Sequence, residues 1–208
     1  MGGGVMGRNR IRLGMDAIAS ADEVIATALV DFGYPEPRVR TRGFEAFLSI
    51  IVSQQLSNEA AATILGRIRG LLPEMSPDAL LKLRETSLRE AGLSWRKVEY
   101  ATGLARAISE GRFGLNELED LSDDEAIREI IAVRGFGRWS AEVYLLFSLQ
   151  RQDIFPADDL ALRVALQRLL HLEARPTAAV ARRLVDHWAP WRSVGSLFLW
   201  HFYRGVPA

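Results

Sequence analysis

The chain has 208 residues, and its 26 basic and 26 acidic side chains give a formal net charge of zero at pH 7. It has no cysteine, which excludes disulfides, thiol nucleophiles, and zinc or iron–sulfur sites ligated by cysteine. No apolar run approaches the roughly 20 residues needed to span a bilayer, and a neutral total is not typical of a general polyanion binder. We therefore expect a cytoplasmic globular protein with no membrane partner.

Helix signals dominate the chain from the N-terminus onward. Residues 1–18 lack the apolar core of a secretory signal, and we expect a flexible tail there. Further on, Ser20–Glu23 and Ser122–Glu125 have the pattern of capping boxes, and Ser76 precedes a proline at a first helical position. No segment shows the alternation of apolar and polar residues that is typical of a β-strand. The sequence predicts an all-α protein with roughly eight to ten helices over residues 19–208.

Glycines interrupt the helical pattern at Gly135-Phe136-Gly137, and helix resumes near Arg138. Two glycines permit positive φ and close approach of another backbone. The amides from Gly137 to Ser140 would have no intrahelical partner and would lie at the positive end of the helix dipole, which suits a phosphate. An ordinary helix–helix corner explains Gly-x-Gly equally well, but the flanking apolar pattern favours the phosphate site.

Asp158 and Asp159 stand directly before an amphipathic helix. Aspartate is among the best N-cap residues, so this pair taken alone favours capping over catalysis. A carboxylate at a helix N-terminus is also stabilised by the dipole, and it could serve as a fixed negative charge. The three histidines, His171, His187 and His201, fall at no ligand spacing, which gives a metal hydrolase little support.

The segment VRGFGRWSA (Val133–Ala141) resembles the helix–hairpin–helix motif of the DNA glycosylase superfamily, and more closely that of the 3-methyladenine DNA glycosylase II (AlkA) type. The likeness runs from about Phe44 to Arg204. It implies a two-lobed helical fold with the active-site cleft between the lobes, one lobe at about 43–135 and the other from the N-terminal helix plus about 136–208. It also implies a nucleoid-associated monomer that acts on double-stranded DNA containing alkylated bases, here without the N-terminal β domain of larger relatives.

The resemblance makes Asp159 the catalytic carboxylate, with Asp158 supporting it. A fixed anion beside the sugar stabilises the oxocarbenium-like state of N-glycosidic hydrolysis, and it can orient or deprotonate the attacking water. Related enzymes that also cut the strand carry a lysine where this chain has Trp139. The implied reaction is therefore monofunctional and needs no catalytic cofactor.

Trp139 and Trp200 match aromatic residues of the base pocket, where ring faces attract a positively charged alkylated purine. Either could instead be a core residue. Val143 stands where a relative has tyrosine, and the neighbouring Tyr144 is a pocket candidate although it points about 100° away on a helix. Gln54 and Gln55 form a Gln-Gln pair. Gln55 is the expected plug for the gap left by a flipped base, unless both glutamines only solvate a loop.

The remaining carried-over positions concern the DNA backbone and an ion. The expected DNA contacts are Gln55, Leu56, Ser57, Lys97, Gly135, Phe136, Gly137, Arg138, Ser140 and Arg163, with Leu56 the alternative plug and Gln54 in support. The family often holds a Na⁺ or K⁺ ion on hairpin carbonyls, which by position are those of Ile131, Val133 and Phe136. Two alternatives stay open: a non-catalytic helix–hairpin–helix DNA-binding module, and a glycosylase for other damaged or mismatched bases.

Overall fold

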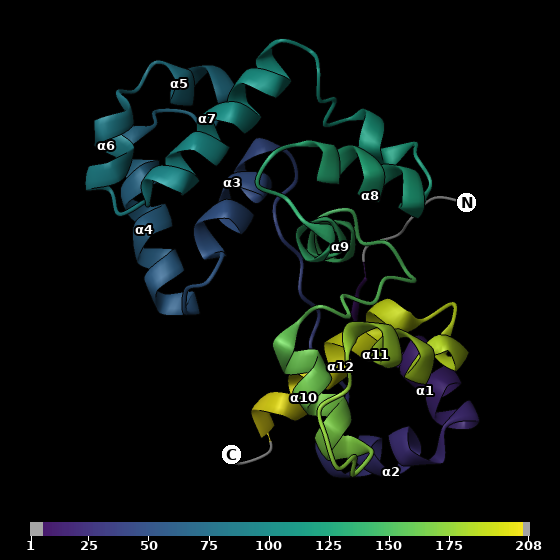
Figure 1. Ribbon diagram of the computed structural model, residues 1–208. Coiled ribbons are helices and arrows are strands. Elements are labelled where there is room, and N and C mark those ends of the chain that lie inside the picture. The colour runs from purple at the N-terminus through teal and green to yellow at the C-terminus, as the bar shows by residue number, and fades with distance from the viewer. Residues whose placement is uncertain (1–5, 206–208) are drawn as a thin grey trace. The chain divides into compact units, whose positions relative to one another are not determined.

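The computed structural model describes residues 6–205, and every regular element within them is a helix (Figure 1). The predicted all-α fold is confirmed. These residues form twelve α-helices and two 3-10 helices. This is more than expected, because pieces as short as Pro77–Leu81 form separate helices with their own caps. No helix in the described part of the chain is long and apolar enough to cross a membrane.

The predicted flexible tail is wrong over residues 8–18, which belong to helix α1 (Arg8–Ala21). Ile11, Met15 and Ile18 form an apolar stripe on this helix and are almost fully buried. Residues 1–5 of the expected tail lie outside the described residues. The capping box expected at Ser20 is also wrong, because Ser20 lies inside α1 and Asp22 caps the next helix.

The described chain forms two compact units. Unit 1 contains the residues up to Val39 and those from Leu145 onward, and unit 2 contains Arg40–Tyr144. The sequence-based division lay at about residue 135, whereas the structure keeps the hairpin and most of the following helix in unit 2. Phe136 and Tyr144 both pack on Phe47, which holds that helix to the core of unit 2.

Unit 1 is built around helix α12, which is buried along an unbroken run from Ser193 to Leu199. Small residues allow this close packing: a Cβ on Gly195 would lie 2.4 Å from the Trp188 ring. The elements of unit 1 are α1, α2 (Glu23–Phe32), α10 (Leu160–Leu169), α11 (Ala178–Leu184), η2 (Asp186–Trp188) and α12 (Arg192–Gly205). Helices α10, α1 and α2 pack directly on α12.

Unit 2 has an aromatic core centred on Phe47, with the rings of Phe113 and Phe136 edge-on to it and Tyr144 stacked at 4.0 Å. Its elements are α3 (Phe44–Ser53), α4 (Asn58–Leu71), α5 (Pro77–Leu81), α6 (Glu85–Glu90), α7 (Trp95–Ser109), η1 (Glu117–Glu119), α8 (Asp123–Ala132) and α9 (Arg138–Phe147), whose last residues belong to unit 1. The predicted capping box at Ser122–Glu125 is confirmed at the start of α8, and so is the cap at Ser76 before Pro77.

Candidate active site

The hairpin between α8 and α9 is shaped by a close contact with α7. Gly135 has a φ of +102°, and a Cβ there would lie 2.5 Å from Cγ of Tyr100. Both its backbone conformation and this contact require glycine. The Phe136 amide donates to the Val133 carbonyl at 3.2 Å and closes the turn. Phe136 itself is buried in the core of unit 2, so it anchors the turn and its ring does not face solvent.

Gly137 differs from Gly135 in both respects. Its φ lies outside the left-handed region, and no atom lies within 4 Å of the place where a Cβ would stand. The first helical bond of α9 runs from the Ala141 amide to the Gly137 carbonyl at 3.1 Å. The amides of the first turn of α9 therefore begin at an open position, where another backbone can approach closely.

The side chains around this turn have structural partners. Arg138 donates to Glu142 at 2.9 Å, and the Glu142 carboxylate is almost fully buried. Ser140 is 3% exposed, so its hydroxyl is not available as a surface contact and only its amide remains a candidate. Trp139 is partly exposed in the first turn of α9.

The predicted plug lies in a tight turn between α3 and α4. The Leu56 amide donates to the Ser53 carbonyl at 3.2 Å, and Gln55, in the middle of the turn, has a φ of +58°. The Gln55 side chain is exposed, and Leu56 is 41% exposed. Ser57 caps α4 by accepting a hydrogen bond from the Ala60 amide, so its hydroxyl has a structural role that the sequence analysis did not include.

Lys97 and Gln54 hold this turn from its inner side. Lys97 Nζ donates to the carbonyls of Val52 and Gln54, each at 2.7 Å, and its direct contact with DNA stays a prediction. Gln54 Nε2 donates to the Gly135 carbonyl at 2.8 Å and links the turn to the hairpin. Sequence reasoning missed this link, and it missed Tyr100, because neither contact leaves a local pattern.

The candidate catalytic carboxylate, Asp159, lies in unit 1 at the start of α10. Asp159 is the N-cap residue, and its Oδ1 accepts a hydrogen bond from the Leu162 amide at 3.1 Å. The same oxygen accepts one from Trp200 Nε1 at 3.2 Å. Trp200 is partly exposed and packs against Phe147, with ring centroids 5.2 Å apart. The structure thus brings the predicted acid and one predicted pocket aromatic into direct contact.

Asp158 does not cap the helix. Its carboxylate pairs with Arg182 of α11 at 3.3 Å, so its support is limited to the loop that carries Asp159. Arg163 lies one turn after Asp159 and is partly buried, and its Nε has no hydrogen-bond partner within residues 6–205. Its contact with a phosphate stays a prediction.

Tyr144 is not a pocket residue in this structure. It is 1% exposed, stacks on Phe47, and accepts a hydrogen bond from the Gly43 amide at 3.3 Å. Burial raises the pKa of its hydroxyl. The prediction that Tyr144 lines a base pocket is corrected, since its ring belongs to the core of unit 2. Val143 beside it is buried as well.

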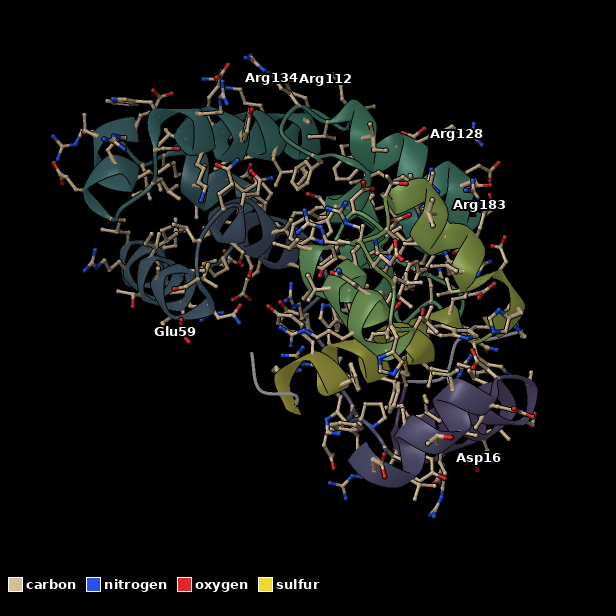
Figure 2. All side chains as sticks on the ribbon, turned by 60° about the horizontal axis from the view of Figure 1, so that its bottom comes forward. Asp16, Glu59, Arg112, Arg128, Arg134 and Arg183 are labelled. Atoms are coloured by element: carbon tan, nitrogen blue, oxygen red, sulfur yellow. The ribbon has the colours of Figure 1, made fainter. Side chains whose placement is uncertain are left out.

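A groove of about 630 Å³ lies along α7, lined among others by Val98, Thr102 and Phe113. Arg112 and Arg134 also line it, and Figure 2 shows both projecting outward at one edge of the protein. Arg134 pairs with Glu99 and Arg112 with Glu110. Neither Asp159 nor Trp139 lines this groove, so it is separate from the candidate catalytic residues.

The hairpin that joins α8 to α9 defines a helix–hairpin–helix protein. It is followed along the chain by an N-cap aspartate that contacts a tryptophan. Residues 48–190 match the family described as HhH-GPD superfamily base excision DNA repair protein, and the chain belongs to this family.

Relatives and solved structures agree with this family. DNA-3-methyladenine glycosylase 1 of Schizosaccharomyces pombe is 32% identical over 163 residues, which cover 76% of this chain and 71% of that protein. The structure of the S. pombe 3-methyladenine DNA glycosylase in complex with abasic DNA has a TM-score of 0.84 and 28% identity, with 90% of this chain and 94% of that chain covered. A Bacillus subtilis (strain 168) relative is 30% identical, and the match spans 76% of this chain but 58% of that protein's length.

Proposed function

We propose that the protein is a monofunctional DNA glycosylase that removes alkylated purines of the 3-methyladenine and 7-methylguanine type from duplex DNA and leaves an abasic site. Water supplies a hydroxyl to the sugar C1′ and loses its other proton to solvent, while the electron pair of the glycosidic bond stays with the cationic base, which departs neutral. The observation that carries the proposal is the hydrogen bond from Trp200 Nε1 to Asp159 Oδ1. It places a carboxylate and a partly exposed aromatic ring side by side, in a chain of the base excision repair family.

Asp159 suits the role of a fixed anion. Its Oδ1 already accepts two hydrogen bonds, one from the backbone and one from Trp200, so the carboxylate is held in one orientation. A preorganised negative charge stabilises positive charge that develops on the sugar as the glycosidic bond breaks. The same carboxylate can orient or deprotonate the attacking water. An alkylated purine is positively charged and departs readily, so no strong general acid is required.

Base recognition is assigned to Trp200 and Trp139. An aromatic face attracts a cationic base by about 0.5–2 kcal/mol, while an ordinary neutral base gains less. The name of the S. pombe relative, a DNA-3-methyladenine glycosylase, supports alkylated purines over other damaged bases. Val143 is buried and carries no hydroxyl, so a polar contact that a tyrosine makes elsewhere has no counterpart at this position.

The proposed absence of strand cleavage is argued from the positions of the lysines. Schiff-base chemistry needs a free amine, and the position that carries it in strand-cutting relatives is Trp139 here. The two lysines of the chain are Lys82 and Lys97. Lys97 is committed to two backbone carbonyls in unit 2, and Lys82 lies at the exposed end of α5. Neither replaces the missing amine.

DNA is held by the hairpin and the plug turn. The first amides of α9 bind a backbone phosphate at the open position beside Gly137, and Gln55 fills the gap left by the flipped base. A Na⁺ or K⁺ ion fits the carbonyls of Ile131, Val133 and Phe136, since neutral oxygen donors suit hard monovalent cations. The Val133 carbonyl also accepts a hydrogen bond from the Phe136 amide, and its second lone pair is left for the ion. Such an ion would add positive charge near the bound phosphate. The protein acts as a monomer at the nucleoid.

Asp159→Asn tests the reaction on methylated duplex DNA. Asparagine is an equally good N-cap, so the helix start survives while the negative charge is lost. We expect release of methylated purines to fall by about 10²–10³-fold, with strand nicking only after alkali in the wild-type reaction. Base release that survives in Asp159→Asn would contradict the assignment of Asp159 as the catalytic carboxylate. Binding without release by either protein would support a non-catalytic DNA-binding module.

A further inference from the structure

The turn that carries Gln55 adopts a conformation that its own sequence does not favour. Gln54 has φ −55° and ψ 123°, Gln55 has φ +58°, and the Leu56 amide bonds to the Ser53 carbonyl. This is the pattern of a type II turn, whose third position normally takes glycine or asparagine. Glutamine there is strained, and such strain persists only where the surroundings hold it in place.

Three hydrogen bonds join the turn and the residue before it to other parts of unit 2. Lys97 Nζ donates to the carbonyls of Val52, just before the turn, and of Gln54, just before Gln55. The Gln54 side chain extends to the hairpin and bonds the Gly135 carbonyl. Gln55 is therefore the exposed tip of a turn that is fixed on its inner side, and its side chain is projected outward because its neighbours are tied down.

Helix α7 supports both DNA-contact loops on one face. Lys97 bonds the plug turn, and Tyr100, one helical turn further along, lies against Gly135 of the hairpin. Residues three apart share a helix face. The Gln54–Gly135 bond then joins the two loops directly, so the positions of the plug and of the phosphate-binding turn are set by the same helix.

The choice of lysine is informative. Of the 26 basic residues, Lys82 and Lys97 are the two lysines and the rest are arginines. A compact ammonium with three donors can bond two carbonyls that converge on one point, whereas the planar guanidinium fork suits carboxylates and phosphates. Partial burial lowers the pKa of Lys97, because it removes water from around the ammonium.

We propose that Lys97 and Gln54 are positioning residues that hold Gln55 in the plug conformation and fix the plug turn to the hairpin. The inference rests on the proposed function. Neither side chain acts on the base, and both act through Gln55.

A double-mutant cycle between Lys97→Met and Gln55→Ala tests this role through single-turnover excision from methylated duplex DNA. Each single variant is expected to lose about 10- to 100-fold in rate, the scale of a mispositioned contact. The double variant should be no slower than the slower single variant, because Lys97 acts through Gln55. Multiplying losses, or an unchanged rate in Lys97→Met, would overturn the inference.

The same double-mutant cycle is repeated in an Asp159→Asn background, where base excision is suppressed. The signal is the fluorescence of a 2-aminopurine placed opposite the lesion, measured at saturating protein. Lys97→Met and Gln55→Ala should each reduce the fluorescence change on binding, and Lys82→Met, at the exposed end of α5, should leave it as it is. Gln54→Ala keeps Lys97 and is the second test if Lys97→Met fails to fold. An unaltered fluorescence signal in Gln54→Ala would overturn the positioning role of Gln54. Wild-type protein that releases no base would refute the proposed function, while this fluorescence would still decide the inference.

Discussion

The two glycines of the hairpin serve different purposes, although the sequence presents them as one Gly-x-Gly motif. Gly135 is required by the protein itself, because its backbone is left-handed and the Tyr100 ring occupies the place of a Cβ. Gly137 has no such reason within residues 6–205, since the space around it is open. Its lack of a side chain is consistent with the proposed function, in which a DNA backbone approaches the open position beside it.

This contrast gives a prediction at the residue scale. Gly135→Ala should lower the free energy of unfolding by more than about 1 kcal/mol from the left-handed backbone alone, with a further loss from the contact with Tyr100. Gly137→Ala should change that free energy by less than about 1 kcal/mol, the scale of exchanging glycine for alanine at an N-cap, yet weaken binding to duplex DNA. Urea unfolding and fluorescence anisotropy measure the two quantities. Equal losses of stability in both variants would show that the glycines are equivalent.

Residue-scale prediction from sequence succeeded where the role is local and failed where a distant partner decides it. The position of Asp159 at a helix start followed from Asp158-Asp159 preceding an apolar periodicity, and the structure has this N-cap. The roles of Lys97 and Tyr144 did not follow. Lys97 bonds carbonyls some forty residues earlier in the chain, and Tyr144 is placed by the Phe47 ring. Side-chain spacing on one helix contains no information about either partner.

At the scale of elements, caps explain which helix boundaries could be predicted. Ser76 and Ser122 cap helices as expected, because the serine bonds an amide only three residues ahead. Near the N-terminus the prediction was wrong, and Asp22, not Ser20, caps α2. Asp22 accepts hydrogen bonds from the Val24 and Ile25 amides, and also from His187 and Trp188. The side-chain bonds to η2 tie the start of α2 to a distant part of unit 1.

These contacts predict a pH dependence of stability. Burial would raise the pKa of Asp22, but hydrogen bonds from Trp188, His187 and the Ile25 amide outweigh it and hold the pKa below its ordinary value. A carboxyl whose pKa is lowered on folding stabilises the protein above the unfolded-state pKa of about 3.9, and this contribution is lost as pH falls through the folded-state value. Asp22→Ala should cost about 0.5–2 kcal/mol at pH 7. In urea unfolding the gap to wild type should narrow below about pH 4; a gap independent of pH would contradict an ionised Asp22 as its source.

At the scale of the whole molecule, the zero net charge fits a DNA-binding protein whose main contacts are main-chain amides and not arginine side chains. Many arginines are paired on the surface, with Arg42 bonded to Glu119 and Arg69 to Glu45 as examples. At the hairpin, Arg138 is bonded to the buried Glu142. A phosphate site made of main-chain amides needs no basic excess, which reconciles the composition with the family.

Salt dependence measures this balance directly. Each phosphate neutralised by a lysine or arginine contributes about −0.9 to the slope of log K against log of the salt concentration, and neutral amides contribute little because they release few counterions. For binding to duplex DNA between about 50 and 200 mM NaCl, we expect a slope with a magnitude of about 3 or less. Arg138→Gln should change it by less than about 0.5, since that guanidinium is already bonded to Glu142. A slope of about −6 or steeper would mean that basic side chains carry the affinity, and that the neutral total conceals a strongly basic DNA-binding face.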